Sequence, residues 1–281
     1  MKRKGSSRKK SELDTKLSPK QPNIAKCQAN ARTEVERWVR RALDKGVGGL
    51  REEFLSLKRY IPEGMTTNAF QGTFEAGKSR YKDVPCQDKF RVVLRWPGVT
   101  DDYIHANYVA TPINEKRFIC TQVRALAPDE TNVRVCHLKV QWKESGREKN
   151  REIRHYQWIN WPDRGVPPCR LTSMVLLSNI RGTKKPIVVH CSAGIGRTGA
   201  IVAIEYILEK LQQGIPCESM DKILKELRNQ RPFTIQNDLQ YLYVHRVMLF
   251  YFIDKYKIFA DNDEVMAKYK QFVADYDKIT K

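Results

Sequence analysis

The sequence predicts one large α/β domain in which a twisted mixed β-sheet is flanked by helices. Short segments rich in β-branched and aromatic residues fill the middle of the chain, and amphipathic helical segments dominate its C-terminal half. Between them, the apolar run 186–189 leads into a glycine-rich loop, as expected for a central strand buried on both faces. With 281 residues, 41% of them hydrophobic, the chain can bury a sizeable core.

The N-terminal part of the chain is predicted to be a tail followed by two helices. Residues 1–30 combine many lysines with almost no large apolar residues, which indicates a basic disordered tail. Apolar positions then recur at helical spacing over Arg32–Leu43, and a second helical run covers Leu50–Tyr60. We expect the folded domain to occupy residues 31–256, with a C-terminal helical extension over 257–281.

The remaining elements are read from the same periodicities. Strand-like segments are expected at Phe90–Leu94, Tyr103–Ala110, Phe118–Thr121, Val133–Trp142 and Glu152–Trp158. Helical segments are expected at Leu171–Ile180, Arg197–Leu211, Met220–Arg228, Asn237–Phe252 and Glu264–Lys278. The helix that starts at Arg197 follows the glycine-rich loop directly, so this loop connects the central strand to a helix.

Charge and cysteine content limit the classes of partner and compartment. The net charge is +19, and residues 1–26 hold nine lysines and arginines against two acidic residues. Such a charge balance favours anionic partners, namely phosphorylated peptides, nucleic acid or acidic lipid. Three roles fit the tail: a solvated extension without function, a signal for nuclear import, or an electrostatic anchor. The seven scattered cysteines form no CxxC pair, and there is neither a secretory signal nor an apolar run of roughly 20 residues. Reduced thiols in the cytoplasm, or in the nucleus through the basic tail, are therefore expected.

The decapeptide 190–199, HCSAGIGRTG, has the composition of a phosphate-binding loop. Gly194 and Gly196 let successive backbone N–H groups point inward, and the following helix contributes its positive N-terminal end. The guanidinium of Arg197 fits two phosphate oxygens. Together these groups are expected to lower the pKa of the Cys191 thiol. A buried cysteine before an ordinary turn would leave the arginine and the glycines unexplained.

Two neighbours of the nucleophile receive supporting roles. Thr198 can donate its hydroxyl to the Cys191 sulfur, and His190 can fix the loop through backbone contacts.

The decapeptide resembles the signature of the classical protein tyrosine phosphatases, and further motifs appear in the order of that family. The loops resemble those of nematode members most closely, and the resemblance covers about residues 34–254. The matching motifs are Lys78–Val84 for the phosphotyrosine-recognition loop, Asp102–Tyr108 for the segment after it, Trp161–Asp163 for the mobile acid loop and Gln236–Tyr241 for the glutamine loop.

The resemblance implies hydrolysis of phosphotyrosine through a cysteinyl-phosphate on Cys191, with no cofactor and no metal. Asp163, on a loop anchored by Trp161, would protonate the leaving phenolate and then deprotonate the attacking water. Gln236 and Gln240 would position that water.

Specificity for tyrosine is expected from the rim of the site. An aromatic ring at Tyr81 makes a slot deep enough for phosphotyrosine and too deep for phosphoserine, although a half-buried loop aromatic is the alternative reading. Asp83 could hold the backbone N–H groups of a bound peptide. The phosphate would lie on the backbone of Ser192, Ala193, Gly194, Ile195 and Gly196. The absence of lysine among these residues argues against phosphoinositide substrates.

The resemblance breaks after Gln122, where several dozen residues of the family pattern are missing. The missing part normally carries a turn, a core strand and a loop with a glutamate at the site; Ser79 also stands where asparagine is usual. A lost core strand leaves backbone groups unpaired and a void. A splice form, a gene-model error and a truly reduced domain all fit this omission.

Three functional hypotheses follow. The first is an active tyrosine phosphatase acting on phosphotyrosine-containing proteins. The second is an impaired phosphotyrosine-binding pseudophosphatase. Nucleic-acid binding through the tail is the third, and the chain lacks the aromatic-interleaved basic patch that it would need.

Overall fold

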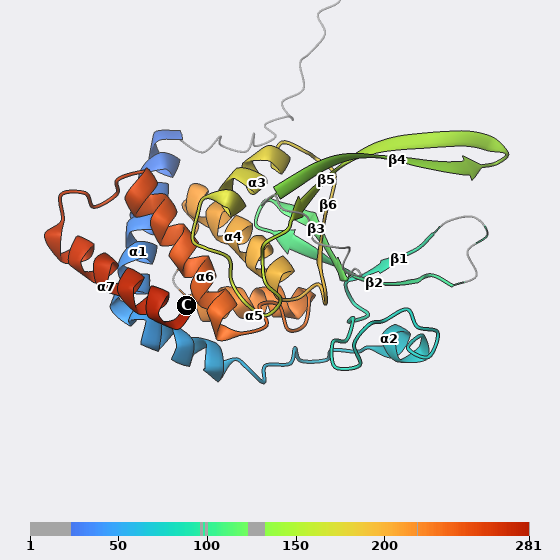
Figure 1. Ribbon diagram of the computed structural model, residues 1–281, viewed down its shortest axis with the longest axis horizontal. Coiled ribbons are helices and arrows are strands. Elements are labelled where there is room, and N and C mark those ends of the chain that lie inside the picture. The colour runs from blue at the N-terminus through green and yellow to red at the C-terminus, as the bar shows by residue number, and fades with distance from the viewer. Residues whose placement is uncertain (1–23, 96–97, 99–100, 123–132, 218, 281) are drawn as a thin grey trace, which may run out of the picture.

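The computed structural model describes residues 24–95, 98, 101–122, 133–217 and 219–280 (Figure 1). Its helices are α1 (Ile24–Ser56), α2 (Asn68–Gly72), α3 (Thr172–Ile180), α4 (Arg197–Gln212), α5 (Met220–Gln230), α6 (Asp238–Leu249), the π-helical turn η1 (Phe250–Lys255) and α7 (Asp263–Thr280). Its strands are β1 (Arg91–Val93), β2 (Tyr103–Thr111), β3 (Asn114–Gln122), β4 (Val133–Glu144), β5 (Arg147–Trp158) and β6 (Ile187–Cys191). The predicted α/β class is confirmed.

A four-stranded mixed sheet carries the glycine-rich loop. Its strand order is β1-β2-β3-β6, with β1 and β3 antiparallel to β2 and with β3 parallel to β6. In the parallel pair Gln122 lies opposite Cys191, so the end of β3 borders the start of the loop. The register therefore brings a residue from the middle of the chain next to the predicted nucleophile.

The hydrophobic core is centred on α4, which is buried over most of its length. Ile204 and Ile207 of α4 are fully buried, as are Leu242 and Val244 of α6, and α1 and α5 also contact α4. Because α4 is packed on several sides, its position directly after the glycine-rich loop is held rigidly. The C-terminal helix α7 packs on α1 and α6 and contributes to the same core, so the predicted extension 257–281 is part of the packed body over its described residues.

The N-terminal helices differ from their predicted bounds. α1 runs from Ile24 to Ser56 with a kink at Gly46, whose φ of 58° is left-handed, so the two predicted helices are two arms of one kinked element. Glycine adopts this conformation without the steric cost that a Cβ would bring. The first arm begins at Ile24, inside the segment 1–30 that we predicted as a tail. Residues 1–23 lie outside the described residues.

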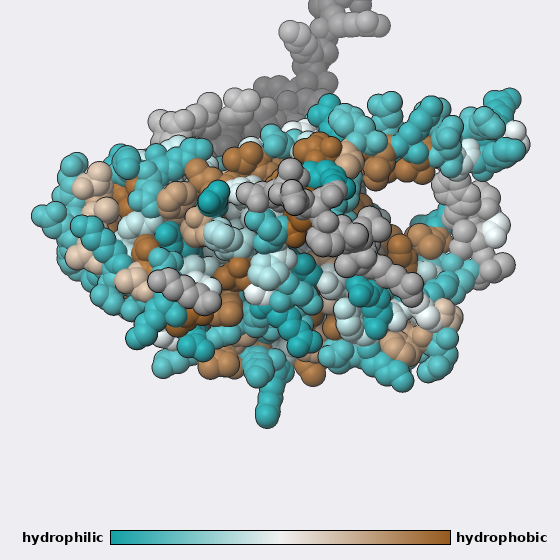
Figure 2. Space-filling model, viewed as in Figure 1, coloured by the Kyte–Doolittle hydropathy of each residue, from teal (hydrophilic) through white to brown (hydrophobic). Residues whose placement is uncertain are grey.

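Strands β4 and β5 form a separate long hairpin that projects from the body (Figure 1). They pair continuously from Val133 opposite Trp158 to Glu144 opposite Arg147. Both strands extend beyond the predicted bounds toward the turn that joins them. This turn is tight, with positive φ at Ser145 and Gly146, so the backbone pairing continues up to it. Apolar surface lies along the hairpin beside hydrophilic side chains in Figure 2. It includes Leu138, which is 46% exposed.

The position of β6 corrects one expectation. We predicted a central strand buried on both faces, but Val188 is 58% exposed. Within the described residues β6 pairs only with β3 and is an edge strand, because the hairpin forms a sheet of its own instead of joining the mixed sheet. None of the helices described here is both long enough and apolar enough to cross a membrane.

Candidate active site

The glycine-rich loop turns between the end of β6 at Cys191 and the start of α4 at Arg197. Gly194 has a φ of +69°, and a Cβ built on it would stand 2.3 Å from the carbonyl oxygen of Thr121. A Cβ on Gly196 would stand 2.8 Å from both side-chain polar atoms of Gln240. Gly194 is therefore required by close packing against backbone and by its positive φ, whereas a side chain at Gly196 would push the end of the Gln240 side chain aside.

The Cys191 sulfur lies where the loop can stabilise a thiolate. Burial raises the pKa of this thiol, but hydrogen bonds from the hydroxyl and amide of Thr198 and from the amide of Gly194, together with the charge of Arg197, outweigh it and leave the pKa below its ordinary value. The Gly194 amide nitrogen is 3.3 Å from Cys191 Sγ. The buried Thr198 hydroxyl has no other hydrogen-bond partner among the described residues, which leaves it free to donate to this sulfur.

Arg197 joins the glycine-rich loop to the acid loop. Its Nη2 donates to Ser192 Oγ at 2.5 Å and to Asp163 Oδ1 at 2.9 Å, and its Nη1 donates to the carbonyl of Trp161 at 3.1 Å. The Asp163 side chain is 61% exposed. The structure therefore brings the predicted nucleophile, arginine and acid to one place, with the acid at the open side.

The acid loop is anchored by Trp161, which is buried. Its ring lies edge-on to Trp158 and packs on Tyr243 of α6, with centroid distances of 4.8 and 5.1 Å. Its Nε1 donates to the carbonyl of Gly165 at 3.1 Å, which closes the loop on itself.

The glutamine loop packs against the glycine-rich loop from the other side. Gln240 is buried at the start of α6 and accepts a hydrogen bond from the backbone of Gln236 at 3.0 Å. The side-chain oxygen of Gln236 would stand 3.1 Å from a Cβ on Gly196. The backbone of Ile235 donates to the carbonyl of Ile195 at 2.9 Å and ties the two loops together.

The recognition loop covers the remaining side of the site. The half-buried Tyr81 packs on a small apolar cluster that contains Ala193 and Ile195 of the glycine-rich loop. The Arg80 guanidinium lies over the Tyr81 ring at 5.1 Å and donates to the carbonyl of Ser192 at 3.1 Å. Asp83 is exposed two residues beyond Tyr81.

Ser79, the departure from the family pattern in this loop, is buried and has a defined partner. Its hydroxyl lies 3.1 Å from the hydroxyl of Tyr103 on β2. Burial raises the pKa of Tyr103 to about 12, so this phenol stays neutral and able to hydrogen-bond.

His190 makes a ring contact that the sequence did not indicate. We expected it to fix the loop through backbone contacts, which stays a prediction; its ring stacks on His155 of β5, with a centroid distance of 5.7 Å and an interplanar angle of 14°. Burial and the neighbouring His155 lower the pKa of His190. This stack brings the base of the hairpin against the end of β6.

Arg231 supports the loop from beneath and was missed by the sequence analysis. This buried arginine donates to the carbonyls of Gly194 at 3.2 Å and Ala193 at 3.1 Å, and to Asn107 Oδ1 at 2.8 Å. It also contacts His105, and burial followed by the arginine charge lowers the pKa of that imidazole to about 4. No local pattern marks Arg231, because all four partners are distant in sequence.

Gln122 is a second missed residue. Its Nε2 donates to the carbonyl of Lys78 at 3.0 Å, and its Oε1 accepts from the backbone of Arg80 at 3.1 Å. Since Gln122 lies opposite Cys191 in the sheet, it fixes the recognition loop relative to the nucleophile.

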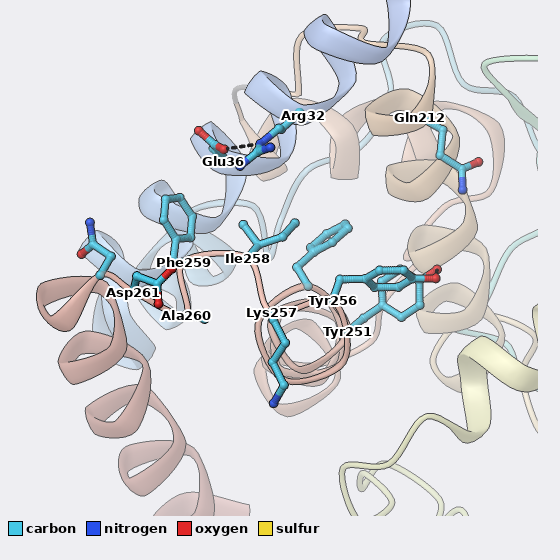
Figure 3. A pocket seen from close by; sticks show the side chains of 12 residues that line it. Arg32, Glu36, Gln212, Tyr251, Tyr256, Lys257, Ile258, Phe259, Ala260 and Asp261 are labelled. Carbon is cyan, nitrogen blue, oxygen red and sulfur yellow. Dashed lines mark hydrogen bonds and ion pairs between the residues drawn. The ribbon is translucent and has the colours of Figure 1, made fainter.

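A surface pocket of about 740 Å³ lies elsewhere, between the N-terminal part of α1 and the segment after η1 (Figure 3). Its lining includes Tyr251, Tyr256 and Phe259, together with the ion pair of Arg32 and Glu36. None of its lining residues belongs to the loops around Cys191. The pocket is therefore separate from the candidate active site.

A thiol with a lowered pKa, donor groups around it, an arginine and an exposed carboxylic acid define the site class of a cysteine-dependent phosphatase. A family model described as protein-tyrosine phosphatase matches residues 75–128 and 126–250. The chain belongs to the protein-tyrosine phosphatase family.

Individual relatives agree with this assignment. Human tyrosine-protein phosphatase non-receptor type 9 is 26% identical over 273 residues, covering 72% of this chain and 46% of the relative. Tyrosine-protein phosphatase Lar-like of Caenorhabditis elegans is 27% identical over 275 residues, covering 77% of this chain and 12% of the relative. The chain thus spans less than half the length of these relatives. The catalytic domain of human protein tyrosine phosphatase non-receptor type 18 shares the fold, with a TM-score of 0.58, 22% identity and coverage of 78% and 98% of the two chains.

Proposed function

We propose that this chain hydrolyses phosphotyrosine in proteins through a cysteinyl-phosphate intermediate on Cys191. The observation that carries the proposal is the Arg197 guanidinium, which contacts Ser192 of the glycine-rich loop and Asp163 of the acid loop beside a thiol whose pKa is lowered. A nucleophile, a phosphate clamp and a proton donor therefore surround one small space.

In the first step the Cys191 thiolate attacks phosphorus, and the bond from phosphorus to the tyrosine oxygen breaks. Arg197 turns its two donors to the phosphoryl oxygens and stabilises the charge that develops there. Asp163 gives its proton to the leaving phenolate, which departs as neutral tyrosine. The products are the S-phosphocysteine and a free tyrosine side chain.

In the second step a water attacks phosphorus and the bond from sulfur to phosphorus breaks. Asp163, now a carboxylate, takes the proton of that water, while Gln236 and Gln240 orient it. The Thr198 hydroxyl stabilises the leaving thiolate, and inorganic phosphate is released. The closeness of both glutamine side chains to Gly196 of the glycine-rich loop supports this role.

The preference for phosphotyrosine is assigned to Tyr81 and Asp83. The packing of Tyr81 on Ala193 and Ile195 supports a slot wall beside the phosphate loop. Asp83 is exposed and available to the backbone of a bound peptide. The uncharged side chains of the loop favour a substrate with a single phosphate.

We also propose that the chain is an internally shortened, nematode-like version of the domain. The match to human non-receptor type 9 runs over 273 positions but takes in only 72% of the 281 residues, so many positions of the relative have no counterpart here. The family model matches in two pieces that meet at 126–128, close to the predicted break after Gln122. The exposed edge strand β6 fits the loss of a neighbouring strand. By composition, the chain would act in the cytoplasm, with the nucleus as a second site.

A non-catalytic phosphotyrosine-binding module is the second candidate, favoured by the exposure of Val188 on β6. Weak support on this side could leave the cradle able to bind phosphate and too imprecise to cleave it. Against this stands Asp163, which a pure binder does not need.

The deciding experiment measures release of phosphate from a phosphotyrosine peptide by the purified full chain. Circular dichroism and a cooperative melting curve first show that the sample is folded. We expect turnover with wild type, none above background with Cys191→Ser, and at least about 100-fold lower kcat/KM with the matching phosphoserine peptide. A folded wild-type protein that binds the phosphotyrosine peptide and releases no phosphate would establish the binding module instead.

A further inference from the structure

Asn237 contacts two loops of the site with the two ends of its side-chain amide. Its Nδ2 donates to the carbonyl of Arg164 at 2.6 Å, and its Oδ1 accepts from the backbone of Gln240 at 2.9 Å. The first contact reaches the residue directly after Asp163. The second caps the start of α6, where one of the water-positioning glutamines lies.

The acid loop has few polar contacts with other loops. Residues 161–165 bond to themselves through Trp161 Nε1 to the Gly165 carbonyl and through the Gly165 amide to Pro162. The side chains of Arg197 and Asn237 reach this segment from other loops. A bound phosphate recruits the guanidinium of Arg197, whereas the contact of Asn237 can persist through the reaction.

The backbone at the contact point is strained. Arg164 has a φ of 58°, a left-handed conformation that a residue with a Cβ adopts at a cost. The Asn237 amide bonds to the carbonyl of this residue and so stabilises the turn that directs Asp163 toward Arg197.

We propose that Asn237 is a positioning residue that ties the acid loop to the glutamine loop and thereby holds Asp163 in register with the water-positioning glutamines. The inference rests on the proposed phosphatase function and adds a residue to it. A single side chain would then set the geometry of both halves of the reaction, because Asp163 acts in each of them.

The test removes the N–H donor of the Asn237 side chain and keeps an oxygen that can accept a hydrogen bond. Asn237→Asp and Asn237→Ser both keep an oxygen that can cap α6, and both lack the amide donor to Arg164. The aspartate adds a negative charge near Asp163, whereas the serine is neutral. A loss shared by both variants therefore comes from the missing contact and not from charge.

Asn262 offers a matched control. Its Oδ1 accepts from the backbone of Val265 at 2.9 Å and caps the start of α7, away from the acid loop. Asn262→Asp and Asn262→Ser repeat the same chemical changes at a cap with no second contact to a catalytic loop.

Two readouts are needed on all five proteins. With a phosphotyrosine peptide, we expect both Asn237 variants to lower kcat about five-fold, the effect of one lost hydrogen bond, with KM nearly unchanged. Hydrogen–deuterium exchange in a peptide covering 161–168 should become about five-fold faster in both Asn237 variants. The Asn262 variants should match wild type in both measurements.

The outcomes distinguish this inference from the proposed function. If kcat of the Asn237 variants equals that of the Asn262 variants, the positioning role is wrong while the phosphatase function stands, whatever the exchange shows. If wild type is folded but inactive, the proposed function fails, and the exchange rates alone decide whether Asn237 ties the loop. Unchanged exchange in that case removes the tie as well.

Discussion

The helical side of the active site and the β4–β5 hairpin differ most in how they are packed. Leu242 and Val244 of α6 are fully buried against α4, whereas Leu138 and Val140 of the hairpin are 46% and 43% exposed. The helical side holds the glycine-rich loop through Arg231 and Gln240, and the hairpin touches its base through His155. The cradle is therefore supported mainly by the helical side, and the hairpin lies beside it.

This difference predicts that substitutions in the two regions have unequal effects on both chemistry and stability. Three matched pairs of the same residue type, one residue from each region, and a fourth pair within the four-stranded sheet provide the direct tests.

The largest expected difference is between two cysteines. Cys191→Ser should lower kcat by about 10⁴-fold or more, because it removes the nucleophile. Cys136→Ser on β4 should leave kcat within about two-fold of wild type, since Cys136 lies on the hairpin and takes no part in the reaction. Steady-state hydrolysis of a phosphotyrosine peptide checks both, and a large loss in Cys136→Ser would show that the hairpin is integral to the site.

A leucine pair compares stability. Leu242→Ala creates a cavity in the core and should lower the free energy of unfolding by about 2–5 kcal/mol. Leu138→Ala should cost about 0.5 kcal/mol or less, because this residue is 46% exposed to water already. Urea denaturation followed by circular dichroism measures both, and equal losses would contradict the packing difference.

A glycine pair compares backbone requirements, because both positions have positive φ. An alanine Cβ at Gly194 meets the Thr121 carbonyl at 2.3 Å, so the loop must shift, and kcat/KM should fall about 100-fold. A Cβ at Gly146, in the hairpin turn, meets no atom within 4 Å, so Gly146→Ala should carry only a conformational cost of about 1 kcal/mol. Peptide kinetics and melting curves on each variant distinguish a lost site from a strained turn.

The last prediction compares the pH at which two thiols on neighbouring strands become reactive toward an alkylating reagent. The thiolate is the reactive form, so a thiol with a lowered pKa is alkylated at lower pH. The rate of iodoacetamide labelling of Cys191 should reach half its maximum below pH 9.0, the ordinary value, whereas burial raises the pKa of Cys120 to about 12 and should keep it unlabelled. Mass spectrometry of labelled peptides gives both curves, and a midpoint for Cys191 at or above 9.0 would remove the case for a stabilised thiolate.

Local features of the sequence were enough to predict most of the elements and the loop. The helix after Arg197 and the strand before Cys191 are encoded by periodicity, and the loop by its glycines, so each could be read within about twenty residues. The predicted strands also exist, although β4 and β5 continue further to a shared turn.

Features that depend on distant contacts could not be predicted. Arg231 bonds to residues up to 126 positions away, and nothing beside it in sequence indicates its burial. The pairing of Gln122 with the recognition loop depends on the parallel register of β3 and β6. The exposure of Val188 likewise reflects which strands join the sheet, a property that an apolar run alone does not determine.

The hydrogen bonds of Arg197 have a consequence for how the site discriminates among anions. Its guanidinium already holds three oxygen partners, which are Ser192 Oγ, the Asp163 carboxylate and the Trp161 carbonyl, so an incoming anion competes with them for its N–H donors. A monoanion such as chloride offers little in exchange, whereas a phosphate dianion supplies two oxygens and more charge. A phosphate that wins this competition would also release the Asp163 carboxyl group, which is the acid of the proposed reaction.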